Sequence, residues 1–301
     1  MASTRPLGPL SPAETEVRGR LRSHIEVLSE RIGGRDAQHP AALSETLDYL
    51  ENELSSFGYG PSRQKFSYGG QDFVNLEAER IGAKHLGAVV CVGAHYDTAG
   101  GLPGANDNGS GVAATLELAH QFATLEPSRT LRFLFFANEE PPYFQTDGMG
   151  SYVYAKRCRE RHEDITAMLS LETIGYYSDQ PGSQNYPVGL PPIYPDRGDF
   201  LSFVSDLRSV LLLRAALKAF RNATSLPAEG AAGPTLVPGI GWSDHWSFWQ
   251  FGYRALMVTD TAPYRYPYYH SAEDTPDKLD YDRLSRAFTG IAALVRNLTA
   301  A

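Results

Sequence analysis

The sequence predicts an α/β protein built on one largely parallel (mixed) central sheet with helices on both faces. Apolar runs such as 87–94 and 130–137 lack polar alternation, which is typical of strands that are buried on both faces. Segments with apolar residues at helical spacing alternate with these runs, and this alternation favours parallel strands joined by helices. The 301 residues suffice for a single domain with a large core.

The first half of the chain is predicted to begin with two amphipathic helices. Val17, Leu21 and Ile25 repeat at helical spacing, and this first helix is expected to end before Gly33. Two segments of strand composition follow and are separated by a glycine pair. The predicted elements are helices at 17–32 and 43–57, strands at 62–68, 72–81 and 87–94, a helix at 110–125 and a strand at 130–137.

The second half continues the alternation and adds one irregular excursion. Residues 178–198 are rich in Pro, Gly and Tyr, which indicates a long loop rather than a linker between domains. We therefore expect a flexible tail at 1–10 and a single domain at 11–301. The remaining predicted elements are helices at 149–160, 200–221, 244–250 and 284–298 and strands at 165–172, 234–238 and 254–259.

Composition and charge exclude several classes of partner. A formal net charge of −8 argues against nucleic acid, because phosphate binding needs clustered Lys and Arg. We expect neither a membrane span nor a signal peptide, since no run approaches the ~20 apolar residues of a span. Cys91 and Cys158 are expected to be free thiols, which favours a cytoplasmic location, although an exported mature chain has the same pattern. The sequence does not determine the oligomeric state.

Acidic and imidazole side chains follow the predicted strands at the points where the strands end. These are His95 and Asp97 after 87–94, Glu139 and Glu140 after 130–137, and Glu172 at the end of 165–172. Because ligands bind beyond the carboxyl ends of parallel strands, we expect these side chains to converge. Imidazoles and carboxylates without cysteine are donors that suit a pair of Zn²⁺-like ions.

Each of these motifs offers a metal-binding role beside a structural one. His95 can ligate a metal while Asp97 supports its ring, and a His–Asp pair that stabilises a loop is the alternative. Adjacent carboxylates diverge at a strand end, so Glu140 can bind a metal while Glu139 acts on water as general base. A solvated Glu-Glu edge is the alternative there. Glu172 can complete the shell of a second metal or be an ordinary surface carboxylate.

Two loops supply further candidate ligands. Asp107 lies in a glycine-rich loop at 104–111, where its two oxygens can bridge two cations. A phosphate cradle at the following helix is the rival interpretation, but no Lys follows the loop. His270, in a Tyr-rich segment before the last helix, is either a metal ligand or a histidine packed among aromatic side chains.

Four more residues are candidate substrate contacts. Asp244 and His245 stand at the start of a predicted helix, where they can line the substrate cleft or support the ligands from behind. Tyr176 and Tyr269 flank the segments that carry the candidate ligands. Both tyrosines can equally be packing residues.

These motifs, in this order, resemble the di-zinc aminopeptidase family. The resemblance covers about residues 40–299 and depends on five segments. They are GAHYD (93–97), GANDNGSG (104–111), NEE (138–140), SDHWSF (243–248) and YYHSAEDTPDKLDY (268–281). The family includes bacterial leucine aminopeptidases, glutamate carboxypeptidase II and glutaminyl cyclases.

The resemblance implies a phosphorylase/hydrolase-like zinc-peptidase fold with two divalent ions, expected to be Zn²⁺. The implied roles are one ion held by His95 and Glu172, the other by Glu140 and His270, a bridge at Asp107, a general base at Glu139 and a histidine-supporting aspartate at Asp97. Two departures matter. Glu172 stands where the family commonly has Asp, and the connection 141–149 is longer than the family's usual glycine-rich turn.

The activity that the resemblance implies is that of a metal-dependent exopeptidase, an aminopeptidase acting on peptide or aminoacyl substrates. A water that bridges the zinc ions would attack the N-terminal peptide bond, with Glu139 as general base. A single-zinc glutaminyl cyclase and a carboxypeptidase are alternatives with the same fold, and Arg254 and Arg265 offer cations for the latter. A third alternative is a binding module that keeps the peptidase fold and has lost its ions. The sequence does not reveal the preferred N-terminal residue.

Overall fold

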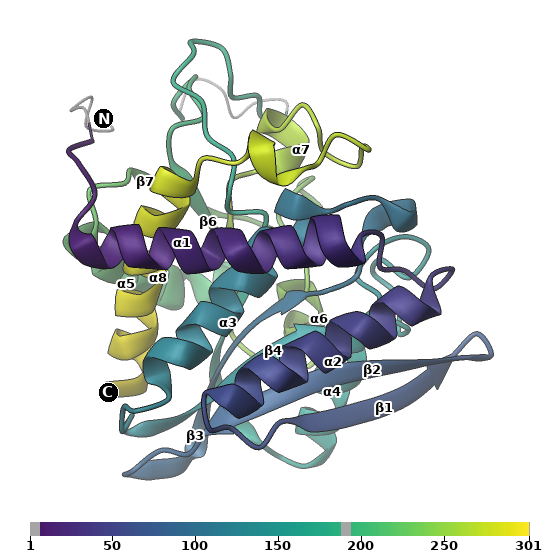
Figure 1. Ribbon diagram of the computed structural model, residues 1–301. Helices are drawn as coiled ribbons and strands as arrows, with labels where there is room; N and C mark the ends of the chain where they lie inside the picture. Colours follow the sequence, from purple (N-terminus) through teal and green to yellow (C-terminus); the bar gives the residue numbers. More distant parts are fainter. Residues whose placement is uncertain (1–6, 188–193, 301) are drawn as a thin grey trace.

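The computed structural model describes residues 7–187 and 194–300, which form an eight-stranded sheet covered by helices (Figure 1). The strand order is β1-β2-β4-β3-β5-β8-β6-β7. The strands are β1 Ser62–Tyr68, β2 Gln71–Arg80, β3 His85–His95, β4 Arg129–Phe136, β5 Asp164–Glu172, β6 Leu201–Ser205, β7 Ala228–Ala232 and β8 Ala255–Thr259. The helices are α1 Pro12–Glu26, α2 Pro40–Ser56, α3 Gly111–Phe122, α4 Gly150–Glu160, α5 Val210–Ala223, α6 His245–Gln250, α7 Ala262–Arg265 and α8 Tyr281–Ala300.

The sheet is mixed, as the sequence predicts. Four neighbouring strands, β4, β3, β5 and β8, run parallel, whereas β2 and β6 pair antiparallel with them on either side. β1 forms a hairpin with β2, and β7 runs parallel to β6 at the opposite edge. Because β4, β3 and β5 are parallel neighbours, their carboxyl ends meet at one edge of the sheet, where side chains of all three can converge.

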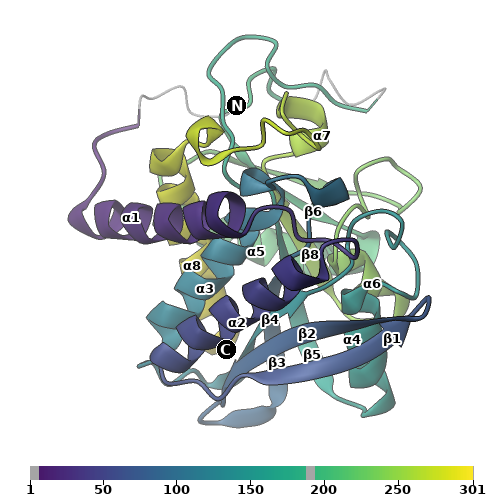
Figure 2. The same ribbon diagram turned by 45° about the vertical axis from the view of Figure 1, so that its right-hand side comes forward.

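Helices cover both faces of the sheet, and each covered face has its own core. In Figure 2, α1, α2, α3 and α8 lie on one side, and α4 and α6, which pack on each other, lie on the other. Successive residues of β3 alternate between the cores, with Val90 and Val92 in the larger one and Val89 and Cys91 in the smaller. Residues 89–94 of the predicted run are therefore buried on both faces, as expected, whereas Gly87 at its start is exposed. The two cysteines are buried free thiols.

Two predicted elements are wrong. The helix predicted at 200–221 is strand β6 followed by α5, because Asp206 accepts a hydrogen bond from the Ser209 backbone N–H and starts a new helical turn. A segment as short as 201–205 carries no periodicity that separates a strand from a helix. The strand predicted at 234–238 lies earlier, at β7, and 234–238 forms turns that include two prolines.

The remaining predicted helices and strands occur within a few residues of their expected bounds. Most of the predicted tail, residues 1–6, and part of the predicted excursion, residues 188–193, lie outside the described residues. The rest of the excursion contains neither helix nor strand. None of the described helices combines the length and the apolar character that crossing a membrane requires. The assignment of 11–301 to a single domain stays a prediction.

One buried arginine ties the N-terminal helices to the loops at the sheet edge. Arg35 is completely buried, and its guanidinium donates to five backbone carbonyls. These carbonyls belong to Leu28, Gly33, Tyr96, Pro103 and Gly104, at distances of 2.7–3.2 Å. Burial lowers the pKa of Arg35 to about 10, so the group stays charged at neutral pH.

We expect replacement of Arg35 by Met to destabilise the fold by about 3–5 kcal/mol, because the carbonyls that it serves lose their donors inside the protein. The matched control is Arg31→Met, since Arg31 is exposed and, among the described residues, contacts only exposed or partly buried groups, Glu45 at 3.8 Å and the ring of Tyr49 at 5.5 Å. The control should change the free energy of unfolding by less than about 0.5 kcal/mol. Urea denaturation measures both. Equal effects of the two substitutions would contradict the anchoring role of Arg35.

Candidate metal centre

The predicted site residues at the strand ends converge. His95 is the last residue of β3, Glu172 is the last residue of β5, and Glu139 and Glu140 follow β4. His95 pairs in register with Phe136 at the end of β4, so these strands terminate side by side. The sheet thus brings together side chains that are up to 77 positions apart in the sequence.

The imidazoles and carboxylates form two groups that share Asp107. In the first group, His95 Nε2 lies 3.2 Å from Glu172 Oε2 and 3.5 Å from Asp107 Oδ1. In the second, His270 Nε2 lies 3.1 Å from Asp107 Oδ2 and 3.2 Å from Glu140 Oε2. The two oxygens of Asp107 therefore face different groups. This is the division of residues that the sequence resemblance implies.

The donor atoms fit a cation. His95, Asp107 and Glu140 each present a ligand atom within 4.8 Å of those of the other two. His95 Nε2, Asp107 Oδ2 and Glu140 Oε1 are buried and have no hydrogen-bond partner among the described residues. Buried polar atoms are normally paired, and an unpaired set that points to a common centre suits a metal ion. Imidazole and carboxylate without thiolate are donors that zinc accepts.

Burial and mutual repulsion keep protons on these carboxyl groups when no cation is present. Burial, with the nearby charge of Asp107, raises the pKa of Glu140 to about 7. Burial also raises the pKa of Glu139 well above its ordinary value, although His95 opposes that shift. For His95, burial lowers the pKa, but the charges of Glu172 and Glu139 outweigh it and the pKa rises. A divalent cation would relieve the repulsion that produces these shifts.

Glu139 stands beside both groups without belonging to either. Its Oε2 is 3.9 Å from His95 Nε2, farther than the carboxylates that make up the two groups. It is 6% exposed and lines the same cavity as Asp107, Glu140 and Glu172. Its carboxylate is therefore available to a molecule in the cavity, as a general base requires.

Asp97 positions the glutamate doublet. Its two carboxylate oxygens accept the backbone N–H groups of Glu139 and Glu140, each at 3.1 Å. The nearest atom to His95 Nδ1 is the backbone carbonyl of Asp97 at 3.2 Å, and the carboxylate is 3.6 Å away. Asp97 thus lies behind His95, as predicted, and it also holds the segment that carries the doublet.

Asp274 holds the backbone of the Asp107 loop, as Asp97 holds the backbone of the glutamate doublet. The sequence did not predict this role. The carboxylate of Asp274 accepts the N–H groups of Asn106 at 2.8 Å and Asp107 at 3.0 Å. Tyr266 donates its hydroxyl to the same carboxylate at 2.7 Å. The place of Asp274 four residues after His270, in the same segment, was the available signal.

Two further positioning contacts were also missed. Asn108 accepts the N–H of Thr173 at 3.1 Å, which joins the Asp107 loop to the end of β5, and its peptide bond with Asp107 is cis. Ser243 donates to Glu172 Oε2 at 2.7 Å and lies 2.8 Å from the hydroxyl of Ser170. Ser243 belongs to the SDHWSF segment, and it fixes the longer side chain that stands in place of the family's usual Asp.

The predicted substrate contacts divide into one cavity residue and three others. Tyr269 lines the cavity, with its ring stacked 3.9 Å from that of His270. Asp244 and His245 are completely buried and do not line the cavity, because α6 begins behind the site. The prediction that these two residues contact substrate directly is therefore corrected: they lie behind the candidate ligands. Tyr176 also lies outside the lining and packs against Tyr266, with ring centroids 4.8 Å apart.

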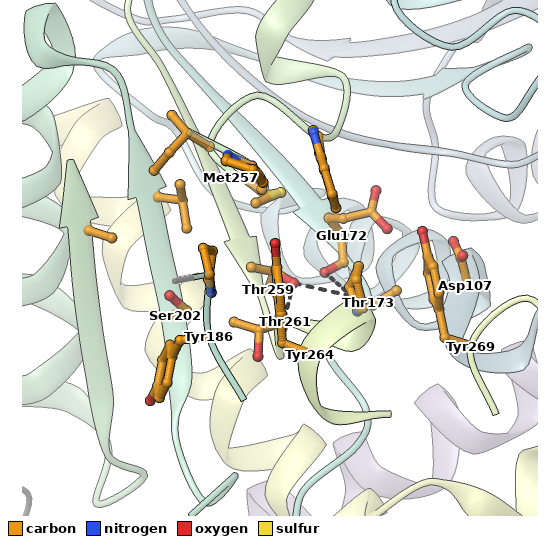
Figure 3. Close-up of a pocket in the computed structure, with 18 of the residues that line it drawn as sticks. Asp107, Glu172, Thr173, Tyr186, Ser202, Met257, Thr259, Thr261, Tyr264 and Tyr269 are labelled. Atoms are coloured by element: carbon orange, nitrogen blue, oxygen red, sulfur yellow. Dashed lines mark hydrogen bonds between the residues drawn. The ribbon is translucent and has the colours of Figure 1, made fainter. Parts of the chain in front are cut away.

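A cavity of about 270 Å³ extends from the metal-binding groups over the sheet. Figure 3 shows Asp107, Glu172 and Tyr269 at one end of it and Ser202 and Tyr186 at the other. The cavity has mostly apolar and aromatic walls. A small number of polar groups in an apolar cleft is typical of a site for a small ligand.

Comparison with known proteins shows to which family this chain belongs. The model of peptidase family M28 matches residues 75–295, which include every member of the two groups. The chain belongs to this family. It is a zinc metallopeptidase of the class that the sequence motifs indicate. The fold predicted for such a peptidase is confirmed as well.

Two curated relatives show how far the likeness extends. The M28 peptidase is 34% identical over 286 residues to the uncharacterized protein YfbL of Escherichia coli, covering 92% of this chain and 87% of that protein. It is 31% identical to leupeptin-inactivating enzyme 1 of Streptomyces exfoliatus over 181 residues, 56% of this chain and 40% of that enzyme. The second alignment therefore spans less than half of the relative.

Two solved structures share the fold. LapA aminopeptidase of Legionella pneumophila aligns with a TM-score of 0.73 at 18% identity, over 99% of this chain and 78% of that one. A glutaminyl cyclase of Fimbriiglobus ruber aligns with a TM-score of 0.71 at 19% identity, over 98% and 99% of the two chains. At these identities the likeness concerns the fold alone, and the same fold carries both activities.

We expect the metal-free M28 peptidase to lose stability as pH rises from 5 to 7. Burial raises the pKa of Asp244 and of Asp260 to about 7. Unfolded aspartates ionise near pH ~4, so the native state holds extra protons between these values. The free energy of unfolding should fall by roughly 1 kcal/mol per pH unit for each such group and level off above pH 7. Urea denaturation of chelator-treated protein measures this.

The matched variant for this pH dependence is Asp260→Asn. Asn keeps an acceptor for the side-chain amide of Asn106, which donates to Asp260 at 2.9 Å, but it has no proton to lose. The variant should therefore show a shallower fall in stability between pH 5 and 7. A wild-type stability that is flat or rising over this interval would contradict the assignment.

Proposed function

We propose that this M28 peptidase is an aminopeptidase that binds two zinc ions and hydrolyses N-terminal peptide bonds. One ion would be held by His95, Glu172 and Asp107, and the other by Asp107, Glu140 and His270. The observation that carries the proposal is the position of Asp107, whose two oxygens face separate imidazole–carboxylate groups 3.1–3.5 Å away. A single ion would leave one of these groups as an uncompensated buried cluster.

Zinc bound at this centre would supply Lewis acidity, which polarises a carbonyl oxygen and makes water more acidic. Glu139 would accept the proton from the attacking water at its carboxylate and return it to the departing amine. Its raised pKa, caused first by burial, suits a group that both takes and gives a proton. Asp97 would hold Glu139 in place through the backbone N–H that it accepts.

The charges of the cavity favour an N-terminal substrate over a C-terminal one. The charged groups on its lining, among the described residues, are the carboxylates of the centre, Glu229 and His270, with no Lys or Arg. Such a lining offers no side-chain cation to a terminal carboxylate, and the four carboxylates of the centre would compensate the charge of the zinc ions. Arg265, offered by the sequence as a cation for a carboxypeptidase, is buried and donates to Gln184 and to the Phe200 carbonyl.

The ammonium group of the substrate would be held by the carboxylates of the centre itself. Asp244, which the sequence offered for that role, is completely buried, and Asp147 is exposed and outside the cavity lining. The names of the relatives agree with an aminopeptidase, because they include a probable leucine aminopeptidase of Arthroderma benhamiae, 27% identical over 65% of this chain and 50% of that protein.

Replacing Glu139 by Gln should abolish most of the activity while zinc binding survives. The change removes the proton acceptor but keeps the side-chain shape, so kcat for leucyl-p-nitroanilide should fall by about 10²–10⁴-fold. Zinc content by elemental analysis should stay at the wild-type level, because Glu139 belongs to neither group. Near-wild-type turnover would contradict the proposed base.

Metal analysis of two histidine variants tests the two-ion arrangement. Wild-type protein should hold about two zinc ions per chain, and His95→Ala and His270→Ala should each retain about one. The N-terminal blocking of the substrate gives a second readout, since acetylated leucyl-p-nitroanilide should not be cleaved. One tightly bound zinc together with pyroglutamate formation from glutaminyl peptides would overturn the proposal in favour of a glutaminyl cyclase.

A further inference from the structure

The floor of the cavity is a row of four side chains that crosses the sheet from the metal centre to its edge. Glu172 of β5 pairs in register with Thr259 of β8, Thr259 with Ser202 of β6, and Ser202 with Glu229 of β7. All four line the cavity. Residues in register on neighbouring strands point to the same face of a sheet, so the row places a carboxylate at each end.

A second row, parallel to the first, is apolar. Met257 of β8 pairs with Val204 of β6, and Val204 pairs with Ala231 of β7. These three side chains also line the cavity. Across from them, Tyr186 and Tyr194 stack with ring centroids 5.6 Å apart. The passage between Glu172 and Glu229 therefore has the hydroxyls of Thr259 and Ser202 on its floor, with an apolar row and an aromatic pair beside them that can pack on the stem of a long side chain.

Glu229 has little within the protein to compensate its charge. Among residues 7–187 and 194–300 its one ion pair is with Arg221, at 3.9 Å, and the Glu229 side chain is 23% exposed. The Arg221 side chain is 51% exposed and already donates to the carbonyl of Ala228. The hydroxyl of Tyr194 donates its hydrogen bond to the carbonyl of Gly230 and not to Glu229. An ion pair with such a long separation and such exposure to solvent contributes little free energy, so the Glu229 carboxylate is available to a ligand.

We propose that the cavity receives the long cationic side chain of an N-terminal lysine or arginine, with Glu229 as the group that binds its charge. This inference rests on the proposed aminopeptidase function, because only an N-terminal residue bound at the centre would direct its side chain along the floor. Ser202, halfway between Thr259 and Glu229, offers a second acceptor for the cationic group. Glu229 would then determine specificity and take no part in bond cleavage.

The dimensions fit a long side chain. Three strand spacings separate the backbones at Glu172 and Glu229, which amounts to roughly 14 Å. A leucine side chain extends only about 4 Å from its Cα and would stop over the apolar row, whereas lysine or arginine extends about 6–7 Å on ordinary bond lengths. The longer side chains would bring their charge to the half of the cavity where Ser202 and Glu229 lie.

The test compares substrates that differ in charge but little in length. Lysyl- and norleucyl-p-nitroanilide have similar four-carbon stems, and only lysine carries a terminal ammonium group. Wild-type enzyme should show a kcat/KM about 10–100-fold higher for the lysyl substrate, which corresponds to one charge-assisted hydrogen bond in a partly buried site. Arginyl- and leucyl-p-nitroanilide extend the comparison to the second cation and to the shorter apolar chain.

The variant that isolates the interaction is Glu229→Gln. It should lose the preference for the lysyl substrate and leave norleucyl turnover within about twofold of wild type, because Glu229 is remote from the centre. The matched control is Glu126→Gln, which removes the same charge from an exposed position in the connection before β4. That control should keep the wild-type preference, which separates a local contact from a change in net charge.

A binding measurement gives a readout that does not depend on turnover. L-lysine should inhibit cleavage of leucyl-p-nitroanilide more strongly than L-norleucine in wild-type enzyme, and equally in Glu229→Gln. A wild-type enzyme that cleaves norleucyl and leucyl substrates but shows no preference for lysine would overturn this inference and leave the aminopeptidase function standing. Failure to cleave any unblocked substrate would instead refute the proposed function.

Discussion

The structure depends on holding several buried carboxylates together at one edge of a sheet. Asp107, Glu139, Glu140 and Glu172 are each less than 10% exposed, and burial, followed by neighbouring negative charge, raises the pKa of the three glutamates. Such a cluster is unfavourable by itself, because burial and like charge both oppose ionisation. Two imidazoles do not balance it. The arrangement becomes favourable once divalent cations occupy the centre, so the fold forms a preorganised cation-binding site.

Rigidity at this edge comes from hydrogen bonds that reach the centre from distant segments. Asp97 holds the backbone of the glutamate doublet, and Asp274 holds the backbone of Asp107 from 167 positions away. Arg35 secures the segment that follows β3 by donating to the carbonyls of Tyr96 and Gly104. Asp107, Glu140 and Glu172 are therefore each fixed by a partner from another part of the chain, which keeps these carboxylates in place against their mutual repulsion.

The sequence predicted which candidate ligands converge because several of them carry a local signal. His95 and Glu172 end apolar runs, and Asp107 lies in a glycine-rich loop. The positioning groups carry weaker signals, since an aspartate that binds backbone N–H groups of a distant loop, such as Asp274, resembles an ordinary helix cap. Strand β6 was mistaken for helix because its five residues are too few to show a measurable period.

The cavity lay beyond sequence reasoning because it arises from register between strands. The row from Glu172 to Glu229 combines residues from β5, β8, β6 and β7, and β6 enters antiparallel, which no local pattern indicates. From the sequence alone, Glu229 cannot be distinguished from an ordinary surface carboxylate in a short Ala- and Gly-rich segment. Cleavage needs only the edge where β3, β4 and β5 end, whereas selection of the side chain uses strands added beside it. The same centre can therefore keep its chemistry while the residues on β6 and β7 change the preferred substrate.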